Sequence, residues 1–375
     1  MALITASNLI NITPEINALT ENSSYAVGIF KYYLYLAIIY YDPEKRQDLR
    51  RVLCYNFLDK TWETLYRESL TNESQLNFIS SKIRVFNDNI YILLESPLGW
   101  QTLRSEFREN SREKVKLVAT TLSPEILNLF SYRQWLSFED NLYFLDEKGN
   151  LINSDLTANL SEFDNEIISE IAVFKNYLYG ATVNLERGFQ IWKKGNQAPL
   201  EPVITNGAYR YTLNEKVFSL VDFQDCLYFV TGVREVGEYS KKTWGIFSTP
   251  NDFEIIRLYP DNDWDIIAGT PRFTPQGLKV PLSGMGPGLD DLSHPQFQFL
   301  KAHNNALFLG IKTAEGLQLW VTENGIDWMT IPEYEFSNFY QVEVDSVFSI
   351  VWGLILVLKV TDLSGVKTLQ IYQIK

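Results

Sequence analysis

The chain has 375 residues, 46% of them hydrophobic and 14% aromatic, a composition that suits a folded core and excludes an intrinsically disordered chain. Lys and Arg total 33 against 46 Asp and Glu, a formal net charge of −13; we expect no nucleic-acid partner, because such a surface repels phosphate backbones. The sequence has no stretch of about 18 uninterrupted apolar residues, so we expect no membrane span and no membrane partner.

An apolar–aromatic pair that follows a turn recurs along the whole chain. The pairs are Leu34-Tyr35, Ile90-Tyr91, Leu142-Tyr143, Leu178-Tyr179, Leu227-Tyr228, Leu307-Phe308 and, in degenerate form, Ile355-Leu356. Most intervals between them are close to the roughly 40–50 residues of a four-stranded propeller blade. The sequence therefore predicts an all-β protein, a seven-bladed β-propeller of four-stranded antiparallel blades that forms one domain over residues 1–375.

The fourth copy shows how each blade should be built. Its strands, here named A to D, are expected at Ile171–Phe174, Tyr177–Thr182, Phe189–Lys193 and near Leu200–Thr205. In an antiparallel meander, the A–B and C–D turns share one face, and the B–C loops and the connections between blades share the other. By this scheme the second copy has a longer B–C loop, from Ser96 to Glu113.

The last strand of the chain, Thr368–Lys375, is expected to be a third strand with no fourth strand after it. An unpaired edge would invite aggregation, so the N-terminus should supply the missing strand. We predict that Ala2–Ala6 or Asn8–Ile12 pairs with Leu369–Ile374 and closes the propeller.

The cysteines and the N-terminus both favour a reducing compartment. Cys54 and Cys226 occupy strand-like positions in different copies, so we expect two buried, reduced thiols. The first residues, MALITASNLINITPEI, have neither a basic start nor a continuous apolar segment, unlike a signal peptide. We expect a cytoplasmic monomer.

Two stretches of the sixth copy resemble known propellers. Thr322–Trp328 (TENGIDW) resembles the Asp-box turn of repeat propellers, which implies a structural hairpin. Phe297–Trp328 is similar to blades in the propeller half of cyanobacterial enzymes that alkylate aromatic rings with alkyl chlorides. This second resemblance implies a bacterial protein of secondary metabolism.

The largest break in the repeat is an insertion, Tyr259–Gln296, between the fifth and sixth blades. It follows Phe253–Leu258, which we expect to be strand D of the fifth blade. Long loops without a period of their own are often functional. The insertion contains Asp261–Asp265 (DNDWD), whose alternating oxygen ligands leave calcium binding open as an alternative to a solvated acidic loop.

The insertion and the B–C loop of the fifth copy, Val233–Lys242, should lie on the same face, near one mouth of the central channel. Arginines there could orient an anionic or phenolic group, Trp could form an apolar wall, and a carboxylate near His could make it an acid or base. The candidate catalytic residues are His294, Arg272 and Asp291, and the candidate binding residues are Arg234, Tyr239, Trp264 and Asp265.

We expect no metal and no cofactor, because two histidines cannot build a three-histidine zinc site and the sequence has no phosphate- or dinucleotide-binding motif. The preferred hypothesis is a propeller that binds a small molecule or a protein on the face of the B–C loops and the insertion. The alternative is an enzyme acting on a small aromatic or anionic substrate, such as an alkylation in bacterial secondary metabolism. Sugar binding by repeated aromatic pockets is a third option, but Trp192, Trp244 and Trp320 are more typical of a core.

Overall fold

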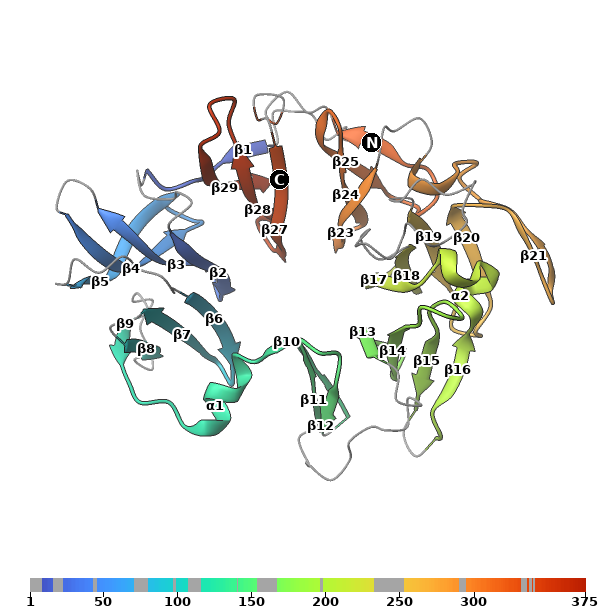
Figure 1. Cartoon of the computed structure of the whole chain (residues 1–375), viewed down its shortest axis with the longest axis horizontal. Coiled ribbons are helices and arrows are strands. Elements are labelled where there is room, and N and C mark those ends of the chain that lie inside the picture. Colours follow the sequence, from blue (N-terminus) through green and yellow to red (C-terminus); the bar gives the residue numbers. More distant parts are fainter. Residues whose placement is uncertain are drawn as a thin grey trace. The chain divides into compact units, whose positions relative to one another are not determined.

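The computed structural model (Figure 1) describes residues 9–15, 23–42, 46–70, 80–96, 99–106, 116–139, 141–153, 167–195, 198–232, 253–289, 295–331, 336, 339 and 341–375. The chain divides into two compact units. Unit 1 includes Tyr132–Ser337, and unit 2 comprises Asn8–Ser131 and Asn338–Lys375. Together they contain the seven blades of a β-propeller, as the spacing of the repeats predicts.

Unit 2 contains blades 1, 2 and 7, each a four-stranded antiparallel sheet. Blade 1 consists of β2 (Ser24–Phe30), β3 (Tyr33–Asp42), β4 (Gln47–Asn56) and β5 (Thr61–Leu70). Blade 2 consists of β6 (Ser80–Phe86), β7 (Asn89–Ser96), β8 (Gly99–Glu106) and β9 (Lys116–Ala119), and the helix α1 (Pro124–Leu129) follows it. Blade 7 consists of β27 (Gln341–Ile350), β28 (Gly353–Thr361), β29 (Lys367–Ile374) and β1 (Leu9–Asn11).

Unit 1 contains blades 3 to 6. Blade 3 is described as β10 (Tyr132–Phe138), β11 (Asn141–Asp146) and β12 (Leu151–Asn153). Blade 4 consists of β13 (Ile167–Phe174), β14 (Tyr177–Val183), β15 (Ile191–Lys194) and β16 (Glu201–Ile204). Blade 5 consists of β17 (Lys216–Phe223), β18 (Cys226–Gly232), β19 (Phe253–Leu258) and β20 (Trp264–Ala268). Blade 6 consists of β23 (Gln296–His303), β24 (Ala306–Thr313), β25 (Gly316–Thr322) and β26 (Met329–Ile331).

The recurring apolar–aromatic pair lies at the start of the second strand in every blade. The first residue of a pair and the aromatic residue after it point to opposite sheet faces, so each blade packs on both sides. In blade 4, Leu178 packs in a cluster with residues of blade 3, and Tyr179 packs in a cluster with residues of blade 5. The repeat is therefore the inter-blade core, which is why it could be read from the sequence alone.

The N-terminal strand completes blade 7. β1 pairs antiparallel with β29, with Leu9 opposite Ile374 and Asn11 opposite Tyr372. Ile12 continues the pairing, its N–H donating to the Ile371 carbonyl at 2.8 Å, and its own carbonyl accepts from the Trp62 indole N–H at 2.7 Å. Of the two segments predicted for this role, Asn8–Ile12 contains the strand, and Ala2–Ala6 lies outside the described residues.

Two strand assignments made from the sequence are wrong. Phe253–Leu258 is the third strand of blade 5 and not the fourth, because β20 pairs with its outer edge. The expected excursion from Ser96 to Glu113 is also corrected: β8 begins at Gly99 and pairs directly with β7 in a tight hairpin. In both places a strand, β20 or β8, was interpreted as a loop because turn-forming residues precede it.

The turn at Thr322–Trp328 is held by side chains of its own residues. The Asn324 carboxamide oxygen accepts from the N–H groups of Ile326 and Asp327, both at 2.9 Å, and the Thr322 hydroxyl oxygen accepts from Gly325 N–H at 2.9 Å. Trp328 is buried in the core between blades 5 and 6. The hairpin has the structural role that the sequence indicated, and the likeness to an Asp box stays a prediction.

Within the described part of the chain, no helix is long and apolar enough to cross a membrane. Cys54 and Cys226 are both buried, as expected from their strand positions, and within the described residues neither forms a disulfide.

Candidate functional site

A cluster of buried polar residues in unit 1 lies where blades 4 and 5 carry their B–C loops and the connection between the two blades. We call this end of the two blades the loop face. The B–C loop of blade 4, Asn184–Phe189, pairs with the connection Thr205–Glu215: Phe189 N–H donates to the Asn214 carbonyl at 2.8 Å, and Gly207 N–H donates to the Phe189 carbonyl at 2.9 Å. Glu254 enters this region as the second residue of strand β19 and has a relative exposure of 0%.

Glu254 is neutralised by Arg272, the first residue of β21 (Arg272–Thr274). The Arg272 Nη1 atom lies 2.9 Å from one carboxylate oxygen of Glu254 and 3.0 Å from the other. The same carboxylate accepts from the Asn214 side-chain amide and from the Thr270 N–H, each at 2.7 Å. Burial lowers the pKa of Arg272, and the adjacent Glu254 opposes that shift. A buried charge of this kind is tolerated because it is paired and hydrogen-bonded.

The cluster contains more positive than negative charge. Arg210 places its Nη1 atom 3.6 Å from Glu254, so one carboxylate faces two guanidinium groups. Among the described residues, the Arg272 Nη2 atom and the Asn214 Oδ1 atom are buried and have no hydrogen-bond partner. A donor and an acceptor in this state carry a desolvation cost of roughly 1–3 kcal/mol each.

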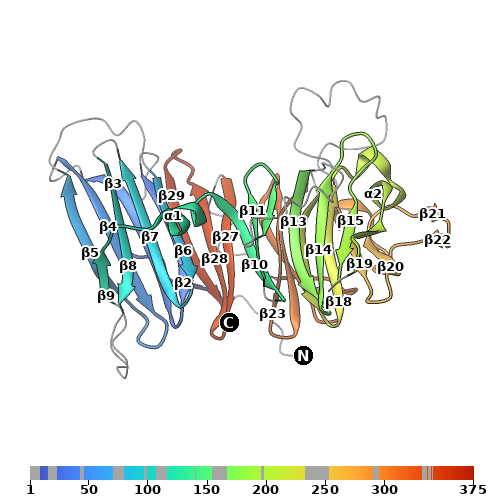
Figure 2. The same ribbon diagram turned by 90° about the horizontal axis from the view of Figure 1, so that it is seen from below.

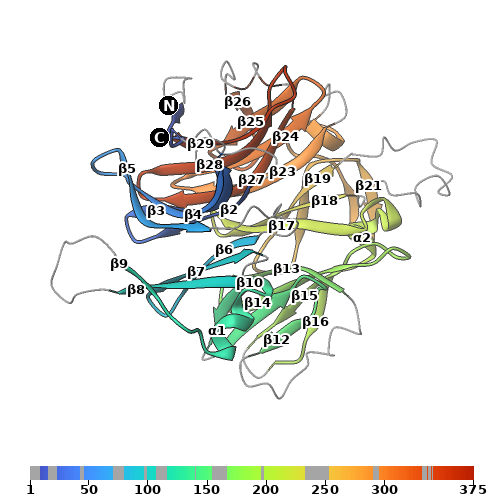
Figure 3. The same cartoon turned by 60° about the vertical axis from the view of Figure 1, so that its left-hand side comes forward.

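The backbone above the cluster is strained. Asn206, Ala208 and Tyr209 have φ values of 55°, 53° and 64°, and Gly207 between them has 59°, so the short element α2 (Asn206–Tyr209) is a left-handed turn. Left-handed geometry costs roughly 1–2 kcal/mol for each non-glycine residue. The Ala208 carbonyl accepts from Arg272 Nε at 2.7 Å, and the Gly207 carbonyl accepts from the Asn214 amide at 3.1 Å. The charged cluster therefore holds this turn, which lies beside β21 (Figure 3).

Beyond the cluster, the chain forms a hairpin that extends away from the sheet of blade 5 (Figure 2). It consists of β21 and β22 (Gly277–Lys279), with Phe273 opposite Leu278. Phe273 is 80% exposed and Leu278 is 57% exposed. Val280 and Leu282, which follow the hairpin, are exposed as well. We call these four residues the hairpin patch.

Both strands of the hairpin are fixed at their base. Arg272 is the Glu254 partner, and opposite it Lys279 donates from its Nζ to the Trp264 carbonyl and to Asp263 Oδ1, the latter at 3.1 Å. The guanidinium of Arg272 and the ammonium of Lys279 lie 5.6 Å and 4.8 Å from the Trp264 ring centre. The hairpin patch is thus presented on an anchored base.

Of the seven residues that the sequence grouped into one site, the structure describes Arg272, Trp264 and Asp265. Arg272 lies on the loop face, where its side chain is only 8% exposed and is engaged with Glu254. Trp264 is the first residue of β20, and its ring packs in the core of blades 4 and 5. His294, Asp291, Arg234 and Tyr239 lie outside the described residues, so their roles stay predictions.

Asp265 belongs to a second cluster near the other end of β19. Its Oδ2 atom accepts from the Tyr259 hydroxyl at 2.6 Å and lies 3.3 Å from Arg257 Nη2. Burial and the bond to Asp265 raise the pKa of Tyr259 to about 12. Tyr259–Asp263 is the C–D turn of blade 5, so Asp265 does not share a site with Arg272.

The calcium alternative finds no support in Asp261–Asp265. Asp261 Oδ1 accepts from the Asp263 N–H at 3.1 Å, whereas Asp263 faces Lys279 and Asp265 faces Arg257. No group of three or more acidic, His or Cys side chains suited to a metal ion occurs in the described part of the chain. The three carboxylates have separate partners and do not converge.

Three residues of the buried cluster were missed from the sequence: Glu254, Asn214 and Arg210. Glu254 follows directly after Asn251-Asp252-Phe253 and looked like part of a strand edge. A signal was nevertheless present, because a carboxylate between Phe253 and Ile255 in an apolar strand requires a buried partner.

The proteins similar to this chain are solved structures of low sequence identity. No protein-family model matches the sequence, and no curated protein matches it. Among solved structures, the chain is similar to the β-propeller domain of the Trilobed protease from Pyrococcus furiosus, with 7% identity, a TM-score of 0.46 and coverage of 95% of this chain and 96% of that one. It is also similar to the Vanderwaltozyma polyspora Nup133 β-propeller domain, with 10% identity, a TM-score of 0.40 and coverage of 97% of both chains.

A third similar structure is the acylaminoacyl peptidase of Pyrococcus horikoshii, with 10% identity and a TM-score of 0.43; 92% of this chain matches 52% of the peptidase. The chain thus spans about half the length of the peptidases it resembles. At such low identities the likeness extends to the fold alone.

Proposed function

We propose that this chain is an interaction propeller that binds a protein partner through the hairpin patch on the loop face of unit 1. The observation that carries the proposal is the exposed cross-strand pair Phe273 and Leu278. Exposed apolar groups gathered in one place are typical of interaction sites, and aromatic anchors carry much of the energy in protein interfaces.

Charge supports a partner with an apolar, uncharged pocket. Lys279 is the single charged residue between positions 273 and 289, in a chain whose net charge is −13. Its charge is directed back to Asp263 and Trp264. The hairpin patch is therefore a neutral area on an acidic protein. The anchored base reduces the ordering cost on binding, which favours affinity.

The proposal is tested with p-benzoylphenylalanine in place of Phe273, a photo-crosslinker that reacts with the bound partner in cells. The matched control carries the crosslinker in place of Val351, which is 81% exposed and lies in a turn of blade 7. We expect one discrete adduct at position 273 and none of that mass at 351. The partner is then purified, and the Phe273→Ser substitution should weaken its binding roughly 30-fold. Equal binding of the Phe273→Ser and Val351→Ser variants would contradict the proposal.

A small anionic ligand is the second candidate, because the Arg272 Nη2 and Asn214 Oδ1 atoms have no partner among the described residues. A ligand with a carboxylate and an adjacent N–H or O–H would complement both. Thermal unfolding with a panel of amino acids and 2-hydroxy acids tests this. A rise in Tm with one compound, absent in Asn214→Leu, is the expected result, and no rise with any compound contradicts the candidate.

The enzyme alternative lacks a comparable observation. Arg272 is engaged with Glu254, and the other two candidate catalytic residues lie outside the described residues. The cytoplasmic location and the monomeric state stay predictions.

A further inference from the structure

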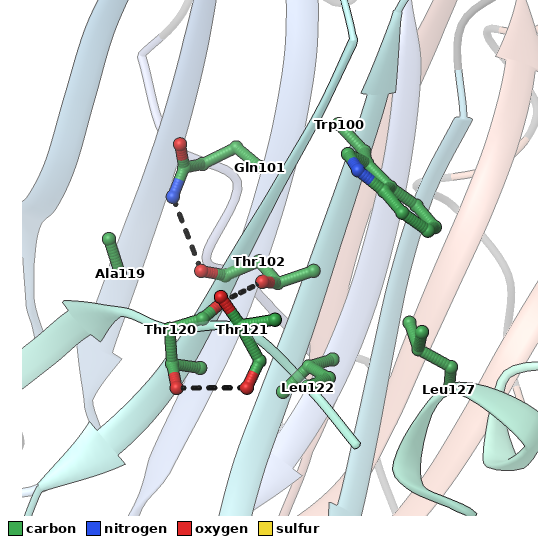
Figure 4. A pocket seen from close by; sticks show the side chains of 8 residues that line it. All are labelled: Trp100, Gln101, Thr102, Ala119, Thr120, Thr121, Leu122 and Leu127. Atoms are coloured by element: carbon green, nitrogen blue, oxygen red, sulfur yellow. Dashed lines mark hydrogen bonds between the residues drawn. The ribbon is translucent and has the colours of Figure 1, made fainter. Parts of the chain in front are cut away.

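A groove in unit 2 runs along the outer strands of blade 2. It is lined by the start of β8, the residues that follow β9 and the helix α1, and its volume is about 410 Å³ (Figure 4). Pockets for small ligands are typically about 300–1,000 Å³. None of the side chains that line it is charged, although 21% of the whole chain is charged.

The groove combines a flat apolar surface with neutral hydrogen-bonding groups. Trp100 is 62% exposed, and its ring lies above Leu127 and on the same side of β8 as Thr102 (Figure 4). Gln101, Thr120 and Thr121 supply an amide and two hydroxyls. An indole exposed to solvent is unfavourable by itself, because it leaves a large apolar face in water.

The polar side of the groove is pre-ordered. The Thr102 hydroxyl donates to the Thr120 carbonyl, and the Thr102 carbonyl accepts from the Thr120 N–H at 3.0 Å and from the Gln101 side-chain amide at 3.2 Å. With its proton engaged, the Thr102 hydroxyl oxygen remains an acceptor for a ligand O–H. The groove thus offers acceptors at fixed positions next to the indole.

The position of Trp100 is also fixed. Buried Arg50 donates from Nη2 to the Ser96 hydroxyl at 2.8 Å and to the Gly99 carbonyl, which brackets the tight turn before Trp100. Gly99 has a φ of 114°, a conformation that favours glycine. Arg50 and Gly99 therefore stabilise the backbone that precedes the exposed Trp100.

We infer that this groove binds a neutral saccharide. The hydrogen-bearing face of a pyranose ring would stack on the Trp100 indole. Its hydroxyls would donate to the Thr102 hydroxyl oxygen and would donate to or accept from the Thr121 hydroxyl. The absence of charge in the lining disfavours phosphates, nucleotides and acidic sugars. This site differs from the aromatic repeat considered from the sequence, because it depends on one tryptophan in one blade. It is independent of the hairpin patch.

The test is calorimetric titration of the full chain with neutral disaccharides and trisaccharides of glucose, galactose, mannose and N-acetylglucosamine. Two control probes are titrated as well: glucuronic acid, which is a charged sugar, and adenosine, which has a planar aromatic ring. We expect at least one neutral saccharide to bind and the other two probes not to bind. Trp100→Ala should weaken binding at least about tenfold, the loss typical of removing a stacking aromatic. Trp100→Phe should restore part of it.

Two further variants distinguish the loss of a contact in the groove from an unspecific effect of substitution on saccharide binding. Thr102→Val keeps the shape of the side chain, removes the hydroxyl and should weaken binding severalfold. Tyr41→Ala removes another exposed aromatic of unit 2, outside the groove, and should leave binding unchanged. The inference is overturned if no neutral saccharide binds at tens of millimolar, if adenosine binds instead, or if Trp100→Ala, folded by its Tm, binds as tightly as the unsubstituted chain.

Discussion

Strand β19 carries a charged cluster near each end, and the two differ in how well their charges are matched. At the loop face, Glu254 is completely buried and faces both Arg272 and Arg210. Towards the other end, Arg257 and Asp265 form a one-to-one pair that is partly exposed and includes the Tyr259 hydroxyl. Burial of the Glu254 cluster carries a larger desolvation cost than the partly exposed Asp265 cluster. The Glu254 cluster also supports the strained turn and the base of the hairpin.

The difference between these two clusters indicates which end of β19 has a functional role. A balanced pair that solvent partly reaches, such as Arg257 and Asp265, contributes less to stability than a fully buried one. A buried cluster with excess positive charge and unpartnered polar atoms is costly, so its retention calls for a role such as positioning a binding surface.

The largest effect should come from Glu254→Gln, which leaves two buried guanidinium groups without a counterion. We expect it to lower the free energy of unfolding by about 3–5 kcal/mol, the range for breaking a buried ion pair. Urea unfolding followed by tryptophan fluorescence measures this. Asp265→Asn at the other end of β19 is the control and should cost no more than about 1 kcal/mol. Equal losses in the two variants would show that the clusters do not differ.

A second effect should come from Gly188→Ala, under the left-handed turn. A Cβ atom there would lie 2.3 Å from the Tyr211 carbonyl oxygen, and the residue has a φ of 87°. We expect a loss of roughly 2–4 kcal/mol from the clash and the strained backbone together. The control is Gly277→Ala in the hairpin, which has a φ of 121° but open space around it and should cost about 1 kcal/mol. A Tm for Gly188→Ala at or above that of the control would refute the tight packing.

A partly buried acid, Glu170 of β13, should make stability depend on pH. Burial raises its pKa to about 7, and Arg133 and Lys216 only partly oppose that shift. Between its ordinary pKa and about 7 the folded state holds more protons than the unfolded state, so stability should fall as pH rises through this window. Glu170→Gln should flatten the fall. Urea midpoints at pH 4.5, 6 and 8 measure it, and a slope that the substitution leaves unchanged would assign the effect to another group.

The smallest effect should be the coupling between Arg257 and Asp265. A double-mutant cycle with Arg257→Met and Asp265→Asn should give an interaction of about 0.5–1 kcal/mol, because solvent reaches both side chains. Raising the salt concentration to 1 M should reduce it further, since screening acts on exposed charges. An interaction energy above about 2 kcal/mol that does not fall at 1 M salt would show that this pair is as strongly coupled as a buried ion pair, and would contradict the contrast with Glu254 and Arg272.

The candidate site was only partly accessible to sequence reasoning. Arg272 was singled out because it follows the last predicted strand of the fifth copy, where a long segment interrupts the repeat. Its burial was not foreseen, because its partners Glu254 and Asn214 lie 18 and 58 residues away (272 − 254 and 272 − 214) and carry no local signature. Trp264 and Asp265 were misplaced because Tyr259–Asp263, with Pro260 and three polar residues, looked like the start of an insertion, whereas it is a turn between two strands.

The sequence by itself determined the propeller, its seven blades and the N-terminal strand that pairs with β29. These follow from alternating apolar residues and from turn-forming Asn, Asp and Gly, which act within a few residues of each other. Only the tertiary structure decided that Arg272 is a buried partner of Glu254, that Phe273 is exposed on an anchored hairpin, and that Trp100 borders a groove. Exposure and pairing depend on which distant segments meet, and a pattern of residue types along the chain does not record this.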